Sequence, residues 1–310
     1  MAGFFSRKEG SNRRGGVSQW ALAWRRFRKN KAAVVGLVIV GVIGGIALFD
    51  RFVAFYPPNC VTYFNPACPA PGLLTRDPPS PAHPFGTDLA GHDVYSQVVY
   101  GTRAAFLVGI GATAVAIAIA TLIGLVAGYF GGWVDNVLMR TTEVFLVLPF
   151  LLLLLVFLKA FFTITPSATG GLWIVVLVIG IFSWPGAARI IRGEVLHIKE
   201  FEFVEASRQI GASGPRILFR HLFPNVLHVI IVLSTLQIAA SILTEEAVSF
   251  LGFGDTNSIT WGQQLANVSS AVKEAWWEGL FPGIFITVLV MGFNLLGNGL
   301  RDALDPRLRE

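Results

Sequence analysis

The chain has 310 residues, of which 54% are hydrophobic and only 14% charged, and its formal net charge is 24 − 19 = +5. Soluble domains carry about 25% charged residues, so this composition excludes an ordinary soluble globular protein. Long apolar runs recur along the chain, and a membrane-spanning helix requires about 20 mostly apolar residues. We therefore expect an integral membrane protein. Because its basic residues flank these apolar runs, nucleic-acid binding is not indicated.

Residues 1–31 form a basic N-terminus that we expect to be cytoplasmic and to contain an amphipathic helix. Trp20, Trp24 and Phe27 share one helical face. Such a helix would lie against membrane lipid, with its aromatic side chains at the acyl boundary. The apolar run that follows is longer than the roughly 7–15 residues of a signal-peptide core, so we expect residues 32–55 to be a retained first transmembrane anchor.

Six apolar windows are long enough to cross a membrane. They are Ala32–Phe55, Ala104–Tyr129, Val137–Phe162, Gly171–Ile191, Val226–Leu251 and Leu280–Leu296. The third is nearly unbroken apart from Pro149, whereas the fifth contains Glu245 and Glu246. Six spans place both termini on one side, and the Lys/Arg clusters mark that side as cytoplasmic. The prediction is an all-α polytopic protein with six transmembrane helices.

Residues 56–100 are rich in proline and are expected to form an extended external loop. This loop contains Cys60 and Cys68, the only cysteines of the chain. A disulfide can persist on an oxidising face of the membrane, so a Cys60–Cys68 bond and two free thiols both remain open. No His or third Cys stands nearby at ligand spacing, and a metal site is not expected.

A polar segment, Glu194–Asn225, interrupts the apolar windows. Its position between two predicted spans indicates that it protrudes into water and contacts another molecule. Gly211 suits a sharp turn between two short helices because it tolerates positive φ, and Pro215 suits the first turn of the second helix. Four small side chains are expected to let the segment sit closely in a partner's groove: Ala206, Ser207, Ala212 and Ser213.

The spacing of Glu205-Ala206-Ser207, Gly211 and Pro224 resembles the EAA loop of binding-protein-dependent ABC importers. Five further segments match the dipeptide/oligopeptide (and nickel) permeases of that group: His83–Asp93, Gly128–Arg140, Ser249–Gly254, Asn294–Gly297 and Gly299–Arg307. The last, with the sequence GLRDALDPR, is similar to the C-terminal signature of one of the two permease types. The resemblance covers the chain from about Ala21 to its end. Ser207 replaces an Ala of the family triplet, and His92 and Gln97 stand where the family often has Arg.

The resemblance implies a type I ABC importer permease with a core at residues 101–310 and a cytoplasmic coupling loop at about 192–225. It implies a homologous second permease, two cytoplasmic ATPase subunits that bind ATP and Mg, and an external solute-binding protein. The complex would lie in the prokaryotic cytoplasmic membrane and import short peptides by alternating access. Permeases of similar sequence import oligosaccharides or nickel complexes, which are the alternative cargoes.

The chain contains no G-x-x-x-x-G-K-[ST] phosphate loop, so we do not expect it to bind a nucleotide in that way. Nor does it show a nucleophile–base pair, and an enzyme is not predicted. An ATPase-independent secondary transporter is a further alternative, although no convincing internal repeat supports it. Glu245 and Glu246 lie in an apolar window, where acidic residues either pair inside the bundle or contact a pathway or gate.

Overall fold

The structure is a computed structural model that describes residues 19–57, 76–164 and 171–304. The described residues are predominantly helical, and their extended pairing is limited to a single bridge between Thr87 and Asp93. The helices are α1 (Gln19–Lys29), α2 (Lys31–Leu48), α3 (Asp50–Val53), α5 (Val94–Phe130), α6 (Gly132–Val147), α7 (Phe150–Ile164), α8 (Gly171–Phe182), α9 (Pro185–Lys199), α10 (Glu202–Gln209), α11 (Gly214–Ile217), α12 (Phe223–Phe250), α13 (Trp261–Val268) and α14 (Trp276–Leu304). Leu218–Leu222 form a π-helical turn between α11 and α12.

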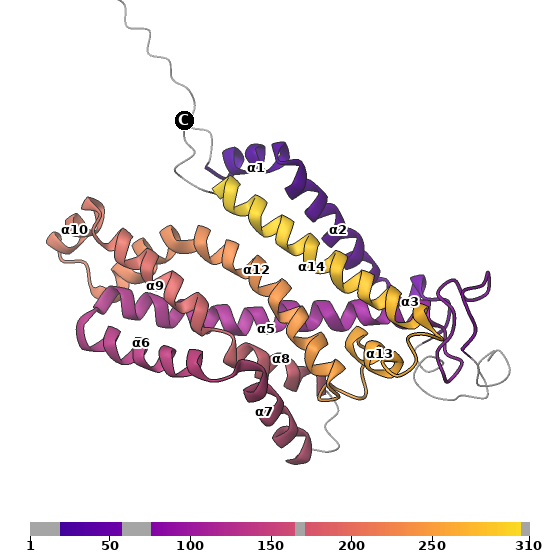
Figure 1. Cartoon of the computed structure of the whole chain (residues 1–310). Coiled ribbons are helices and arrows are strands. Elements are labelled where there is room, and N and C mark those ends of the chain that lie inside the picture. Colours follow the sequence, from indigo (N-terminus) through magenta and orange to yellow (C-terminus); the bar gives the residue numbers. More distant parts are fainter. Residues whose placement is uncertain (1–18, 58–75, 165–170, 305–310) are drawn as a thin grey trace, which may run out of the picture.

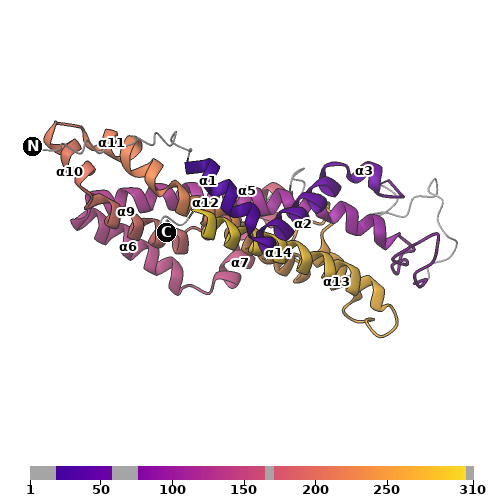
Figure 2. The ribbon, with the colours of Figure 1, turned by 90° about the horizontal axis from the view of Figure 1, so that it is seen from above.

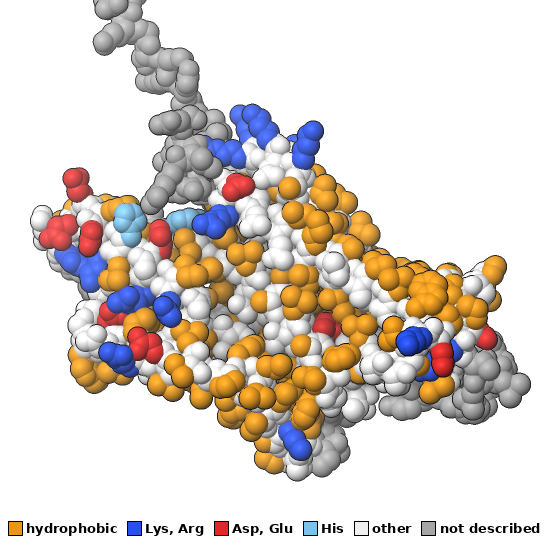
Figure 3. All heavy atoms as spheres, viewed as in Figure 1, with side chains coloured by type: hydrophobic (Ala, Val, Ile, Leu, Met, Phe, Trp, Pro, Cys, Tyr) orange, Lys and Arg blue, Asp and Glu red, His pale blue; other side chains and the backbone are white. Residues whose placement is uncertain are grey.

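Within the described residues, four helical stretches reach membrane-spanning length: α2, α5, the continuous stretch Gly214–Phe250, and α14. Two bent pairs, α6 with α7 and α8 with α9, qualify when each pair counts as one span, which gives up to six. The all-α polytopic architecture predicted from the apolar windows is therefore confirmed. In the face shown in Figure 3, charged side chains gather at the top over α1, at the left around α10 and, in a smaller group, at the right, while hydrophobic side chains cover the flank between them.

Helix α5 runs along the length of the molecule and is the element on which the others assemble (Figures 1 and 2). Its 37 residues extend about 55 Å at 1.5 Å per residue. Helices α8, α9 and α12 all pack against it. Close approach depends on glycine: a Cβ at Gly124 would lie 2.9 Å from the carbonyl oxygen of Ala188, and one at Gly128 would lie 2.7 Å from the Cβ of Val195. Small residues allow such contacts where lipid surrounds the helices.

The third apolar window, Val137–Phe162, is not one continuous helix as its composition suggested. It is divided into α6 and α7, whose axes are bent by 86°. The bend lies at Leu148, which has φ −68° and ψ 136° and is therefore extended. Because proline disfavours the helical conformation of the residue before it, Pro149 accounts for this break. Leu154 and Leu158 of α7 are nevertheless fully buried, against α8.

The first apolar window also differs from its prediction. Helix α2 ends at Leu48, Phe49 is non-helical, and the four-residue α3 follows. The amphipathic helix α1 is present, but its aromatic face does not lie wholly against lipid. Phe27 is buried against the C-terminal part of α14, in a cluster with Ala33 and Ala303. Trp24 stacks on Phe27 and stays exposed.

The molecule is elongated, and different helices form its two ends (Figure 2). We refer to the end with α10 and α11 as the α10 end, and to the end with α3 and α13 as the α13 end. Helix α12 connects them, because it follows α11 directly and packs against α13 at its other terminus.

Candidate functional site

The polar segment after α9 protrudes at the α10 end as two short helices, α10 and α11 (Figure 2). A few apolar side chains hold it on the bundle. Val204 of α10 and Ile217 of α11 are buried in a cluster with residues of α5, α9 and α12. Burying a Val or Ile side chain stabilises by about 1.5–3 kcal/mol, so the protruding segment has a defined position on the bundle.

The turn between α10 and α11 has the geometry predicted for it. Gly211 has φ 81°, a conformation that glycine adopts readily. Its amide donates to the carbonyl of Arg208 at 2.9 Å, and the amide of Ala212 donates to the carbonyl of Ser207 at 3.1 Å. Pro215 occupies the first turn of α11. The helix–turn–helix therefore follows from local sequence.

The exposed surface of this turn differs from the predicted one in two residues. Glu205, Ala206 and Ser213 are exposed. Ser207 is buried and its hydroxyl donates to the carbonyl of Phe203 at 2.7 Å, so its small size serves packing inside the loop rather than contact with a partner. Ala212 is half-buried against the core.

The most exposed apolar side chain of the turn is Ile210, at 85% relative exposure. Ile210 was not among the residues predicted from the sequence, although an isoleucine inside a polar segment is a usable signal. Phe201 and Phe219, elsewhere in the protruding segment, are also exposed. Contiguous apolar patches rimmed by polar residues mark protein-interaction sites, whereas single exposed apolar residues are ordinary.

The second half of the loop is continuous with a spanning helix. Helix α11 passes through the π-helical turn into α12, and Gly214–Phe250 is one continuous helical stretch that is long enough to include a membrane span. Pro224 lies in the first turn of α12, directly after the π-helical turn, and is exposed. Proline lacks an amide hydrogen, and a local change of helical pitch accommodates it without breaking the helix. Helix α11 and helix α12 are therefore parts of one continuous helical stretch.

Two polar contacts hold the stem of the loop, by which we mean the part of α9 from Arg192 to Lys199. Both Nε and Nη2 of Arg192 donate to the carboxylate of Asp135 on α6, each at 2.5 Å. Bidentate arginine–carboxylate pairs of this kind fix orientation as well as distance. Lys199 donates to the carbonyl of Gly128 at 3.3 Å. The first half of the loop is thus connected to α5 and α6, whereas the second half is connected to α12.

Glu245 and Glu246 lie in α12, about 30 Å along the helix from Pro224 at 1.5 Å per residue, so the structure does not bring the two groups of candidate residues together. Both carboxylates are buried. Oε1 of Glu245 accepts from Ser249 at 2.6 Å, and Oε2 of Glu246 accepts from the amide of Gly262 at the start of α13. Glu246 therefore links α12 to α13.

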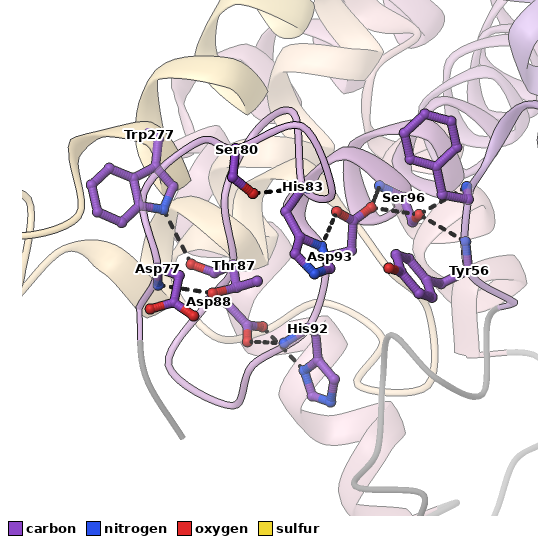
Figure 4. Close-up of polar contacts among 11 residues, drawn as sticks. Tyr56, Asp77, Ser80, His83, Thr87, Asp88, His92, Asp93, Ser96 and Trp277 are labelled. Atoms are coloured by element: carbon purple, nitrogen blue, oxygen red, sulfur yellow. Dashed lines mark hydrogen bonds and ion pairs between the residues drawn. The ribbon is translucent and has the colours of Figure 1, made fainter. Parts of the chain in front are cut away.

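The α13 end has a compact polar cluster before α5 (Figure 4). His83 Nδ1 lies 2.9 Å from Asp93 Oδ1, and both side chains are buried. The other oxygen of Asp93 accepts from the amide and the hydroxyl of Ser96, at 2.8 and 2.7 Å, which caps the N-terminus of α5. The Ser96 hydroxyl oxygen in turn accepts from the amides of Phe55 and Tyr56, each at 3.2 Å.

The same cluster contains His92 and Gln97, which stand where the family often has arginine. Asp88 Oδ2 accepts from Gln97 Nε2 at 2.7 Å and lies 3.1 Å from Nδ1 of His92. Burial by itself raises the pKa of Asp88, but the contacts from His92 and Gln97 outweigh it and hold the pKa below the usual range. Trp277 donates to the carbonyl of Thr87 at 3.1 Å, which fastens the cluster to α14. Cys60 and Cys68 lie outside the described residues.

The comparisons with known proteins agree with this geometry. A family model described as binding-protein-dependent transport system inner membrane component matches residues 120–310. The chain belongs to this family. A second model, the N-terminal transmembrane domain of oligopeptide transport permease C, matches residues 18–77. The first match includes the protruding loop, Glu245 and Glu246, and the second includes α1, α2 and α3.

Individual members of the family resemble the whole chain. A dipeptide transport system permease protein of Bacillus subtilis is 38% identical over 98% of this chain and 91% of its own. An oligopeptide transport system permease protein of the same organism is 34% identical over 95% and 92%. A glutathione transport system permease protein of Pectobacterium atrosepticum is 35% identical over 94% and 92%. The chain is accordingly a multi-pass permease component of a transport system, as its motifs indicated.

Proposed function

We propose that this chain is one of two permease subunits of an ATP-driven importer for short peptides. The observation that carries the proposal is the exposed α10–α11 turn and its helical continuity with α12. A protruding, internally fixed loop joined to a spanning helix is suited to transmit force from a water-soluble partner into the membrane. ATPase subunits would supply that force, with ATP and Mg bound on them.

Docking would use the exposed side of the turn. Ile210 would enter an apolar depression of the ATPase, while Glu205 and Ala206 would line the adjacent contact. Interface energy usually concentrates in a few buried side chains, and complete burial of an isoleucine contributes about 1.5–3 kcal/mol. The loop would lie in the cytoplasm, because it contains Arg208, Arg216 and Arg220 and cytoplasmic loops carry an excess of Lys and Arg.

The transport cycle would be alternating access. Closure of two ATPases would displace the α10–α11 turn, and the Gly214–Phe250 helix would carry the displacement toward the α13 end. There, Glu246 would convey it to α13 through the amide of Gly262. The α13 end would face a solute-binding protein, and a homologous second permease would complete the pathway.

Peptides are the proposed cargo because the relatives are named as dipeptide, oligopeptide and glutathione permeases. Oligosaccharides and nickel complexes remain the alternative cargoes. The test is uptake of labelled dipeptide, oligosaccharide and nickel complex by proteoliposomes that contain both permeases and ATPases, with the binding protein added outside.

The coupling role is tested by Ile210→Asp in the same proteoliposomes. We expect ATPase affinity to fall more than tenfold and uptake to fall with it, because a charge replaces the apolar anchor. Leu89→Asp is the matched control for ATPase binding, since Leu89 is also exposed, at 61%, but lies at the α13 end. Undiminished ATPase binding by Ile210→Asp, or uptake without any ATPase, would contradict the proposed mechanism.

A further inference from the structure

A groove of about 900 Å³ runs along the flank of the bundle between α2, α5 and α8. This volume is at the upper end of the roughly 300–1,000 Å³ typical of small-molecule sites. Its walls are mainly apolar, and its charged residues are confined to Asp50, Arg51 and Arg103. The groove has no part in the proposed coupling path, which runs through α10, α11 and α12.

The groove is somewhat shorter than the hydrocarbon depth of one lipid leaflet. On α2 it reaches from Gly41 to Leu48, about 10 Å at 1.5 Å per residue, and Arg51 follows just beyond that helix. On α5, which runs in the opposite direction, it reaches from Arg103 to Gly111, about 12 Å. Half of the hydrocarbon core is about 15 Å thick, so the apolar part lies at acyl-chain depth and the arginines lie toward the headgroups.

The glycines of α2 leave this groove unfilled. A Cβ added at Gly41 or Gly45 would meet no heavy atom within 4 Å. Packing within the chain therefore does not require glycine at these positions, in contrast to Gly36 of the same helix, whose Cβ would lie 2.7 Å from the carbonyl oxygen of Gly292. Facing them, Trp173 of α8 is 58% exposed at the groove wall. An elongated apolar ligand would fit this open channel.

The charged end of the groove has one excess positive charge. Arg51 and Arg103 contribute +2 and Asp50 contributes −1, which leaves +1. Asp50 is buried and lies 3.7 Å from Arg103, whose side chain is 64% exposed. A smaller hollow of about 240 Å³ adjoins the same three residues and adds the polar side chains of Asn257 and Ser258.

We propose that the groove is a binding site for an anionic phospholipid. One acyl chain lies along Gly41 and Gly45, and the single negative phosphodiester lies at Arg51 and Arg103. Polar groups of the headgroup occupy the small hollow beside Asn257 and Ser258. Phospholipid is favoured over a protein helix because the charge, the depth and the apolar length of the site match one lipid molecule. A protein helix in the same groove would need a buried carboxylate to pair with the arginines.

The probe is phosphatidylglycerol with a photoreactive acyl chain, added to the purified transporter complex in nanodiscs of phosphatidylcholine. Adducts are mapped by mass spectrometry. We expect labelling of the groove residues, competed by unlabelled phosphatidylglycerol and not by phosphatidylcholine. Arg51→Gln and Arg103→Gln should each weaken labelling about fivefold, the change that corresponds to about 1 kcal/mol per basic residue near an anionic lipid. Lys159→Gln, an exposed basic residue on α7, is the charge control.

Gly45→Leu fills the groove and should abolish labelling without loss of assembly, because the added side chain meets open space. Gly41→Leu is a second variant of the same kind. Gly283→Leu on α14 is the matched control, since a Cβ there also meets nothing within 4 Å, and it should label like wild type. Unchanged labelling in both groove-filled variants, or equal labelling by phosphatidylcholine, would overturn the proposal. A cross-link from a photoreactive residue at position 45 to the second permease would also overturn it.

Discussion

Replacement of Gly211 tests whether the conformation of the protruding turn sets its affinity for an ATPase. Gly211 has φ 81°, and an added Cβ would meet no heavy atom within 4 Å. Gly211→Ala therefore adds no clash, and its effect is confined to the backbone. A left-handed conformation costs about 1–2 kcal/mol for a residue with a Cβ.

That cost lowers the population of the docking-competent turn, because nothing packs on residue 211 to hold it. An energy of about 1–2 kcal/mol corresponds to a five- to thirtyfold change in population. The apparent dissociation constant rises by the same factor when only the competent conformation binds. We expect Gly211→Ala to weaken ATPase binding about five- to thirtyfold, measured by titration of ATPase subunits onto the solubilised permease pair.

Two variants make the measurement specific. Gly211→Asn should bind within a few-fold of wild type, because asparagine tolerates the left-handed region better than alanine. Gly252→Ala places the same strain at φ 82°, also without a steric contact, but at the other end of α12. It should leave ATPase binding unchanged. Wild-type affinity of Gly211→Ala, or equal weakening by Asn and Ala, would refute the reasoning.

Three further predictions concern the bundle. Gly128→Val places side-chain atoms against Val195, whose Cβ is 2.7 Å from an added Cβ. We expect it to lower the stability of the solubilised complex by about 1–3 kcal/mol in thermal unfolding. Gly283→Ala, where an added Cβ meets no atom within 4 Å, should not lower it. Asp135→Asn replaces the carboxylate that holds Arg192. We expect it to lower the ratio of uptake to ATP hydrolysis more than it lowers the affinity for the ATPase. An unchanged ratio of uptake to ATP hydrolysis would exclude a role of this pair in positioning the loop. The lowered pKa of Asp88 stabilises the folded state above the unfolded value of about 3.9, and this stabilisation is lost as the pH falls through the folded pKa. Asp88→Asn should therefore lose stability at neutral pH and show a shallower acid dependence of unfolding, and an unchanged acid slope would contradict this assignment.

Properties set by neighbours in sequence could be predicted from the sequence. The length of the apolar windows indicated the spans, and Gly211 and Pro215 indicated the turn and the start of α11, because helix length and backbone conformation depend on adjacent residues. The resemblance of the protruding segment to a coupling loop was also visible in its residue spacing, and the family assignment is confirmed.

Properties that depend on contacts distant in sequence were decided by the tertiary structure alone. Ser207 was predicted to face a partner but turns inward, while Ile210 is left exposed, because the packing of Val204 and Ile217 on the bundle fixes the rotation of the loop. Phe27 packs on α14, more than 250 residues away, and no local pattern contains that contact. Likewise, the window Val137–Phe162 was predicted as one span despite Pro149, but α6 and α7 are bent by 86° and α7 packs against α8. Local sequence determined the helices and the turn, and long-range burial determined which of their faces remain free to bind.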